Sequence, residues 1–373
     1  LGVPMGEPEF KCRAFLKRHG VVVFSSNYAL YGDMSSRVMS TAAGLVPRME
    51  VYSIDEAFLD LTGLPGGPAS AAREIARAVL KATGIPVSVG AGSTRTLAKA
   101  ANRLAKKDPG HGGVLILPEA PGPPEEHLAR LEIGDVWGIG RRHARRLGEL
   151  GVRTALDFTR LPREMVRKRM GVCGLHTWLE LRGTPCIPLD KAPGPRRSVV
   201  SSRSFGRAVT LLSELREAVS CYAAGAAQRL RAGKNLASLA HVWTQTYAGA
   251  ACGREGCASH CLALPHPTSD TRLIARRCLE ALEFLFTPGA RYKKAGVMLS
   301  GIEPAGAHRL SLFHEPDGRA DRLMQALDAV NARWGRDTIF QASCGLGRPW
   351  GMRQEHRSPR YTTAWAELPE AVA

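Results

Sequence analysis

Two sections of the sequence alternate short strand-like apolar runs with helical segments, and a strand-poor section separates them. The first covers residues 49–117 and the second covers residues 198–302, whereas residues 124–183 show helical periodicity and little strand signal. Interleaved strands and helices, with an antiparallel hairpin in the first section, are typical of an α+β arrangement. The 373 residues provide about two to four modules. The pattern therefore predicts an α+β protein of several domains.

Apolar periodicity gives the expected elements. In the first section and the residues before it we expect strands at 21–24, 85–92 and 112–117, a hairpin at 49–61, and helices at 28–43, 69–83 and 96–107. In the second we expect strands at 199–205, 239–245, 260–263 and 295–299, and helices at 213–232 and 270–286. Proline and glycine mark a break at 118–124 and an extended linker at 184–197. A helix at 321–334 and a basic tail follow.

The charge balance indicates a polyanionic partner. Lys and Arg number 51 against 34 Asp and Glu, which gives a formal net charge of +17. Such an excess on a globular chain most often reflects nucleic-acid binding, although a protein that is merely basic is the alternative. No apolar run approaches the roughly 18 residues of a membrane span. Nine scattered Cys, an odd number, fit reduced thiols in a cytoplasm.

One cluster has ligand types for zinc. Cys252, Cys257, His260 and Cys261, with His266 beyond, lie in and after a Gly-rich stretch between two strand-like runs. Thiolates and imidazole bind Zn²⁺, but the spacings are irregular and no second CxxC pair follows. We favour a surface loop with incidental cysteines over a metal site.

The adjacent carboxylates Asp55 and Glu56 interrupt the predicted hairpin at 49–61. Two carboxylates between apolar strand residues repel each other and lose hydration, and a divalent cation would relieve both costs. Mg²⁺ accepts one or two protein carboxylates together with water and substrate phosphates. A solvated hairpin turn is the alternative. The pair is thus a candidate magnesium site.

Three further elements are suited to phosphate. The turn at 90–93 precedes a helix on which Lys99, Arg103 and Lys106 are expected to share a face, and a Gly turn with a cationic helix can hold a triphosphate or a DNA backbone. Residues 137–152 have a helix-hairpin-helix pattern in which Gly138 and Gly140 allow backbone N–H groups to approach a phosphate. The alternatives are an ordinary exposed helix face and a plain packing hairpin.

Arginines add charge to two of these regions. The helix after Gly140 begins with Arg141, and more arginines follow it; such units bind DNA without reading bases. Four others surround the predicted strand at 199–205, where small serines would let the strand approach a phosphate backbone: Arg196, Arg197, Arg203 and Arg207. A solvated basic strand edge is the alternative for this group.

Longer motifs resemble a known family. The segments at 25–35 (SSNYALYGDMS) and 50–60 (EVYSIDEAFLD) strongly resemble the Y-family translesion DNA polymerases, in particular the UmuC type, the catalytic subunit of bacterial DNA polymerase V. The segments at 136–140 (VWGIG), 292–299 (YKKAGVML) and 358–363 (SPRYTT) extend the match over essentially the whole chain.

The resemblance implies a right-hand architecture. Residues 1–27 would be a remnant of the fingers, 28–117 the palm, 118–183 a helical thumb with the helix-hairpin-helix, 184–197 a linker, 198–302 the little finger, and 303–373 a C-terminal tail. Asp55 and Glu56 would be catalytic metal-binding carboxylates for a two-metal Mg²⁺ site, and Lys106 would face the incoming dNTP. Gly138, Gly140, Arg141 and the little-finger arginines would hold DNA.

The resemblance also implies an activity, partners and a location. The chain would perform error-prone synthesis past damaged bases in the bacterial SOS response, acting on primer–template DNA with an SOS-processed accessory dimer and the recombinase filament. It would be cytoplasmic and nucleoid-associated when engaged. The family's first palm strand carries another metal-binding aspartate and an aromatic gate, and this sequence starts after them. We therefore expect the chain alone to be impaired; the alternative is a non-catalytic DNA-binding remnant of a polymerase.

The segment at 309–313 (RLSLF) resembles the sliding-clamp-binding motif of bacterial polymerases. It lies between Pro/Gly-rich stretches, and its large apolar residues, Leu310, Leu312 and Phe313, suit a partner's pocket. The motif usually opens with Gln, whereas Arg309 opens it here and can only donate hydrogen bonds. We expect clamp binding that is weaker than with Gln; a loop folded onto the little finger is the alternative.

Overall fold

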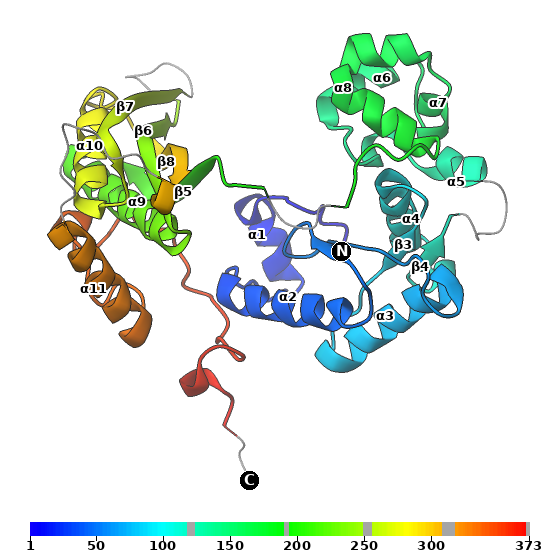
Figure 1. Cartoon of the computed structure of the whole chain (residues 1–373), viewed down its shortest axis with the longest axis horizontal. Coiled ribbons are helices and arrows are strands. Elements are labelled where there is room, and N and C mark those ends of the chain that lie inside the picture. The colour runs from blue at the N-terminus through cyan, green and yellow to red at the C-terminus, as the bar shows by residue number, and fades with distance from the viewer. Residues whose placement is uncertain (118–123, 190–193, 249–255, 308–317, 371–373) are drawn as a thin grey trace. The chain divides into compact units, whose positions relative to one another are not determined.

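The computed structural model describes residues 1–117, 124–189, 194–248, 256–307 and 318–370 (Figure 1). The chain forms two compact units. Unit 1 contains Leu1–Pro193 together with His356–Ala373, and unit 2 contains Gly194–Glu355. The predicted tail at 303–373 is therefore divided between the two units. Mixed helices and sheets in the described residues confirm the α+β class.

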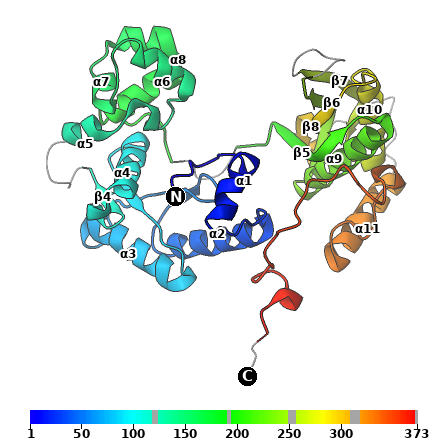
Figure 2. The same cartoon turned by 180° about the vertical axis from the view of Figure 1, so that it is seen from behind.

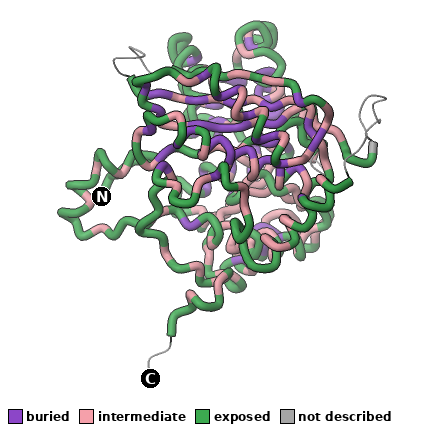
Figure 3. Tube along the Cα trace, turned by 90° about the vertical axis from the view of Figure 1, so that its left-hand side faces the viewer, coloured by how far each residue is buried: buried purple, intermediate pink, exposed green. Residues whose placement is uncertain are grey.

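Unit 1 begins with α1 (Glu9–Arg18), a helix that buries no residue. Near the label N in Figure 3 the chain is almost entirely exposed. The prediction of a strand at 21–24 is wrong: Val22 and Phe24 are 73% and 63% exposed, and the first bridge is made by Ser25 with Arg357. An apolar run needs a partner strand to form a ladder, and the described residues supply none at this position.

The next part of unit 1 contains two helices and a short hairpin, as the sequence predicts. Helix α2 (Tyr28–Ala43) packs against α3 (Gly67–Thr83), and Ala42, Ile75 and Val79 form a small buried cluster (Figure 2). Strands β1 (Met49–Val51) and β2 (Ala57–Leu59) pair antiparallel. The hairpin loop therefore carries Asp55 and Glu56.

A second pair of strands is joined by a helix. Strand β3 (Val89–Ala91) pairs in parallel with β4 (Val114–Ile116), and α4 (Arg95–Lys107) and the short η1 (Pro109–His111) connect them. Gly90 lies against α4 so closely that a Cβ there would be 2.0 Å from the backbone nitrogen of Asn102. This glycine is therefore required for strand–helix packing.

The strand-poor section folds as a helical cluster, as predicted. It contains α5 (Pro124–Arg130), η2 (Ile133–Asp135), α6 (Arg141–Gly148), α7 (Ala155–Thr159) and α8 (Arg163–Leu181). Leu131, Phe158 and Val166 are fully or almost fully buried in its core, which also includes Leu97 and Leu104 of α4. Because side chains of α4 are buried in the same core, α4 packs firmly against the helical cluster.

Glu180 of α8 is fully buried and accepts four hydrogen bonds. Thr96 donates its backbone N–H at 2.9 Å and its hydroxyl at 2.7 Å to Oε2. The backbone N–H groups of Cys186 and Ile187 donate to Oε1 at 3.2 and 3.0 Å. A carboxylate is tolerated in an interior when its oxygens are satisfied. Glu180 thus joins α8, the start of α4 and the segment that follows the helical cluster.

Unit 2 is built on one antiparallel sheet in the order β5-β8-β6-β7. Its strands are β5 (Ser198–Val209), β6 (Asn235–Thr246), β7 (Cys257–Thr268) and β8 (Tyr292–Pro304). Helices α9 (Leu212–Ala232) and α10 (Thr271–Glu283) cover one face (Figure 1). Figure 3 shows buried residues concentrated along these strands, and Val242, Val297 and Leu299 are fully buried.

The rest of unit 2 packs onto this core. It comprises η3 (Ala305–Ala307), α11 (Gly318–Trp334) and η4 (Ala342–Cys344). Trp350 is 5% exposed, its ring lies edge-on to Phe205 and Tyr222, and its indole N–H donates to Glu217 at 3.1 Å. The chain then enters unit 1, where the last short helix is η5 (Trp365–Glu367).

Candidate functional site

The hairpin between β1 and β2 holds the acidic pair in a tight turn. The backbone N–H groups of Tyr52 and Ser53 both donate to the carbonyl oxygen of Glu56 at 3.0 Å. Asp55 is exposed, and its Oδ1 accepts the hydroxyl of Ser53 at 2.5 Å. Among the residues that the structure describes, Asp55 has no Lys or Arg as an ion-pair partner. Its carboxylate is therefore available to a ligand.

A cavity of about 600 Å³ brings the acidic pair together with basic and aromatic side chains. Asp55 and Glu56 line it from the hairpin, and Lys99 and Lys106 line it from α4. Helix α2 contributes a third wall, which includes Tyr28, Tyr31, Met34, Ser35 and Val38. Lys106, which the sequence suggested for triphosphate binding, thus lies in the same cavity as both carboxylates.

Lys99, one of the three cations expected to share a phosphate-binding helix face, forms an ion pair in this cavity that the sequence did not predict. Its Nζ lies 2.7 Å from Oε1 of Glu56, and its side chain is only 16% exposed. The ammonium group also lies 4.9 Å from the ring centre of Tyr52 and 5.5 Å from that of Phe58. Cation–π contact and the ion pair hold Lys99 in place and orient Glu56.

Arg103, expected on the same helix face as Lys99 and Lys106, lies outside the cavity. Its guanidinium donates to Asp135 at 2.6 Å, and Lys107 donates to the other oxygen of Asp135 at 2.6 Å. Burial acts to raise the pKa of Asp135, but hydrogen bonds from Lys107 and Arg103 hold it below its usual range. Arg103 therefore fixes α4 to η2 and is not directed at a cavity ligand.

The donor set of the cavity fits Mg²⁺. Two adjacent carboxylates supply hard oxygen ligands, and this ion completes its octahedron with water and substrate phosphates. Within the described part of the chain no group of three or more His, Cys, Asp or Glu could hold a metal ion. The two carboxylates therefore need oxygen ligands from a substrate or from water.

The helix-hairpin-helix residues lie around the start of α6. Gly138 has φ +90°, and a Cβ there would be 2.7 Å from the hydroxyl oxygen of Thr177 in α8. Gly140 precedes the first residue of α6 and has open space beside it. Arg141 is exposed. Open backbone at a helix N-terminus flanked by cations suits a phosphate.

The four arginines around β5 are divided between two environments. Arg196 and Arg197 are exposed ahead of β5. Arg203 pairs in register with buried Ala295 and acts electrostatically on Tyr222 and Arg229 of α9, so it lies on the helix side of the sheet. Arg207 forms an ion pair with Glu214 of α9. Strand alternation places Ser202 and Ser204 of β5 on the open face, whereas Ser201 lies with the two arginines on the helix side, near Gly225 of α9.

The open face of the sheet presents residues that sequence reasoning missed. Gly296 lies beneath Trp243: a Cβ at this position would be 2.5 Å from the indole and 2.6 Å from Cβ of Ser202. The Nζ of Lys294 lies 5.1 Å from the Trp243 ring. The signal was present in the Lys-Lys-Ala-Gly run of β8, whose glycine makes room for a large ring.

The prediction of a surface loop is wrong for the described members of the cysteine cluster, because residues 257–266 belong to β7. Cys252 lies outside the described residues, and Cys257 and Cys261 are exposed on β7. Cys261 Sγ lies 3.5 Å from His241 Nε2, whereas His260 stacks on Phe284 with 4.5 Å between ring centres. Cys261 and His260, which are neighbours in β7, thus contact different residues and do not share a ligand position.

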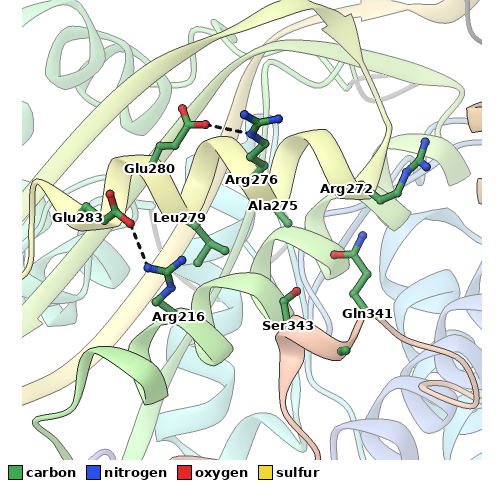
Figure 4. A pocket seen from close by; sticks show the side chains of 10 residues that line it. Arg216, Arg272, Ala275, Arg276, Leu279, Glu280, Glu283, Gln341 and Ser343 are labelled. Carbon is green, nitrogen blue, oxygen red and sulfur yellow. Dashed lines mark hydrogen bonds and ion pairs between the residues drawn. The ribbon is translucent and has the colours of Figure 1, made fainter.

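A second basic cavity lies among α9, α10 and η4 (Figure 4). Its volume is about 580 Å³, and its cations are paired: Arg216 lies 3.0 Å from Glu283 and Arg276 lies 3.4 Å from Glu280. Arg272 lies 2.9 Å from Asp270. Because each guanidinium has a carboxylate partner, the cavity is not a strong anion site.

Across the described residues, no helix is both long and apolar enough to cross a membrane.

Comparison with known families gives three matches. Residues 1–103 match the impB/mucB/samB family, and residues 196–312 match the C-terminal domain of the same family. Residues 321–371 match a domain of unknown function, DUF4113.

Individual relatives cover most of the chain. Protein UmuC of Salmonella typhimurium is 41% identical over 99% of this chain and 88% of the relative. DNA polymerase IV of Moorella thermoacetica is 29% identical over 87% of this chain and 78% of the relative. A solved Y-family DNA polymerase chimera of Dbh and Dpo4 superposes with a TM-score of 0.62, at 23% identity over 81% of this chain and 84% of that one. The chain therefore belongs to the impB/mucB/samB family, within the UmuC-type DNA polymerases of the Y family.

Proposed function

We propose that this chain performs template-directed DNA synthesis past damaged bases in the bacterial SOS response. The observation that carries the proposal is the 600 Å³ cavity that joins Asp55 and Glu56 with Lys106. The carboxylates suit the metal ion of a metal-bound triphosphate, and the exposed lysine suits its phosphates. The lysine offsets the negative charge of the triphosphate that the metal ion does not neutralise. Family membership and a DNA polymerase IV among the relatives support the same reaction.

In the proposed reaction the primer 3′-hydroxyl attacks the α-phosphate of a dNTP, and pyrophosphate leaves. Mg²⁺ bound at the carboxylates would activate the hydroxyl and stabilise the leaving oxygens. Asp55 and Glu56 hold that site, and Lys99 fixes the orientation of Glu56. Lys106 binds the triphosphate. Preorganised charge of this kind costs no rearrangement at the moment of reaction.

DNA binding is assigned to two surfaces. Gly138, Gly140 and Arg141 are proposed to hold duplex phosphates in unit 1. In unit 2, Arg196 and Arg197 are proposed to contact the backbone, and Arg203 and Arg207 are proposed to contribute at the edge of β5. Backbone contacts of this type position a duplex without reading its sequence.

Further partners follow from the same proposal. They are the sliding clamp, bound by Leu310, Leu312 and Phe313, an SOS-processed accessory dimer and the recombinase filament. The clamp segment falls outside the described residues. The proposed location is the bacterial cytoplasm, at the nucleoid when DNA is engaged.

A polypeptide limited to these 373 residues is proposed to bind primer–template DNA but to extend it poorly. The reason is the donor set: in the described residues no third metal ligand joins Asp55 and Glu56. The alternative, a DNA-binding remnant without catalysis, is favoured by the same observation. Mg²⁺-dependent extension by the complete natural protein distinguishes the two functions.

The decisive experiment compares two substitutions on one hairpin. In the complete natural protein, Asp55→Ala should abolish primer extension past an abasic site while DNA affinity stays unchanged or rises, because a negative charge is lost. Asp60→Asn is the matched control, since Asp60 pairs with Arg48 instead of facing the cavity. Near-parental extension by Asp55→Ala would show that this cavity is not the polymerase site.

A further inference from the structure

The last residues of the region matched by the domain of unknown function lie against the start of α2. The N–H of Ser25 donates to the carbonyl of His356 at 2.9 Å. The side-chain amide nitrogen of Asn27 donates to the carbonyls of Ser358 at 2.8 Å and Pro359 at 3.2 Å, and also lies 3.2 Å from the Ser358 hydroxyl. Figures 1 and 2 both show the red C-terminal trace passing the first turn of α2.

Asn27 connects this segment to the helix. It is fully buried, and its Oδ1 accepts the N–H of Leu30 at 3.3 Å, which caps the N-terminus of α2. The other end of the same amide holds the C-terminal segment. The amide accepts for the cap with its oxygen and donates to both carbonyls with its nitrogen, which an ionised carboxylate cannot do because it can only accept.

Helix α2 in turn contacts the cavity and the hairpin that carries Asp55 and Glu56. Tyr28 and Tyr31, in its first turn, line the 600 Å³ cavity and are 69% and 49% exposed. One turn further, the hydroxyl of Ser35 donates to the carbonyl of Ile54, the residue before Asp55. The position of α2 therefore sets the cavity wall and one contact of the acidic hairpin.

The C-terminal segment has order of its own. Both the side chain and the backbone N–H of Arg360 bind Glu367, with Nε at 2.9 Å from Oε1. The N–H groups of Thr363 and Ala364 donate to the carbonyl of Arg360 at 3.0 Å. The carbonyls that Asn27 binds thus lie next to a hydrogen-bonded turn, which holds this part of the chain in place.

We propose that residues 356–360 position α2 for the nucleotide substrate, with Asn27 as the positioning residue. The segment holds the amide of Asn27, the amide caps α2, and α2 presents Tyr28 and Tyr31 to the cavity. This gives the end of the domain of unknown function a role in nucleotide binding. The inference rests on the proposed function, since the cavity is taken to bind the incoming dNTP.

The test separates the two ends of the amide. Asn27→Asp keeps the oxygen that caps α2 but places a carboxylate against two carbonyls. In the complete natural protein, hydrogen exchange should rise about five-fold in residues 356–360 and in the first turn of α2, the scale of one lost hydrogen bond. KM for a dNTP should rise by a similar factor, whereas kcat and DNA affinity change less than two-fold.

Ser358→Ala is the control, because it removes only the hydroxyl contact and leaves both carbonyls in place. It should change exchange and KM less than two-fold. A second variant that ends after Glu355, the last residue of unit 2, should reproduce the Asn27→Asp phenotype, and a peptide of residues 356–370 should partly reverse it. Unchanged exchange in α2 with both variants would overturn the proposal whatever the reaction is. Altered exchange with an unchanged KM would mean that the segment only stabilises α2, and this result would also overturn the proposal.

Discussion

Lys99 and Glu56 form an ion pair in the cavity that also contains Asp55, with 2.7 Å between Nζ and Oε1. Glu56 is thereby shared between a fixed protein cation and any metal ion that enters. The pair is partly exposed, with side-chain exposures of 16% and 34%, so its strength is moderate. Lys99 and a divalent cation compete for the same oxygen.

Replacing Lys99 should therefore change the magnesium requirement. In the complete natural protein, Lys99→Met keeps the apolar stem on Tyr52 and Phe58 but removes the competing charge. The Mg²⁺ concentration for half-maximal extension should fall about two- to five-fold, as expected for an ion pair of this exposure. Arg103→Met, which breaks the contact with Asp135 outside the cavity, should leave it unchanged. A raised requirement in Lys99→Met would mean that Lys99 assists the metal instead.

Duplex binding should depend steeply on salt and hardly on base sequence. Each phosphate contact that is neutralised contributes a slope of about −0.9 to log K against log salt. Arg141→Ala, at the exposed start of α6, should reduce the slope by about one. Arg207→Ala should reduce it less, because Arg207 already pairs with Glu214. Titrations of a fluorescent duplex at several salt concentrations measure these slopes. Equal reductions by Arg141→Ala and Arg207→Ala would contradict the claim that Arg207 is less available to phosphate than Arg141.

Asp60 should make stability dependent on acid pH. Hydrogen bonds from Thr62 and Arg48 lower its pKa from 3.8 to about 2. Because the folded pKa is depressed, the contribution is complete above pH 3.8 and is lost as pH falls towards 2. Asp60→Asn should lower the melting temperature at neutral pH, and its difference from the parent should shrink as the pH approaches 2. Glu370→Gln, at an exposed position, is the control and should leave the melting temperature at neutral pH unchanged.

The segment at 309–313 should bind the sliding clamp as an isolated peptide. A peptide of residues 307–315 should bind at micromolar concentration, Phe313→Ala should remove the binding, and Arg309→Gln should strengthen it, because an amide both donates and accepts. Isothermal titration against purified clamp measures all three. Parental affinity in Phe313→Ala would show that the segment is a linker.

Local patterns were sufficient for most elements of the fold. The alternation around Asp55 predicts the hairpin, and periodicity predicts α2, α3 and α4 within a few residues. The run at 21–24 failed because a strand depends on a partner that periodicity does not supply. Arg203 and Arg207 share the face of β5 that carries buried Val199 and Phe205. Local charge patterning does not show which face the helices cover, because tertiary packing decides it.

The parts of the site that the sequence could not predict are contacts between residues far apart in the chain. Glu56 and Lys99 come from separate elements, and nothing in either local pattern specifies their pairing. Asn27 has the sequence signature of a helix cap, which is the role it plays for α2. Its second role could not be predicted, since its partners are 331 and 332 positions away.

That separation has a consequence for how the chain is made. Unit 1 includes residues on both sides of unit 2 in the sequence, so a ribosome must synthesise all of unit 2 before the pocket around Asn27 can close. At about 5–20 residues per second, the buried amide waits roughly 20 to 70 seconds for its carbonyl partners. During that interval the first turn of α2 is held only by its own cap. Nascent chains stalled before residue 356 should therefore be more open to protease at α2 than released protein, so assembly of unit 1 is completed only after unit 2 has been synthesised.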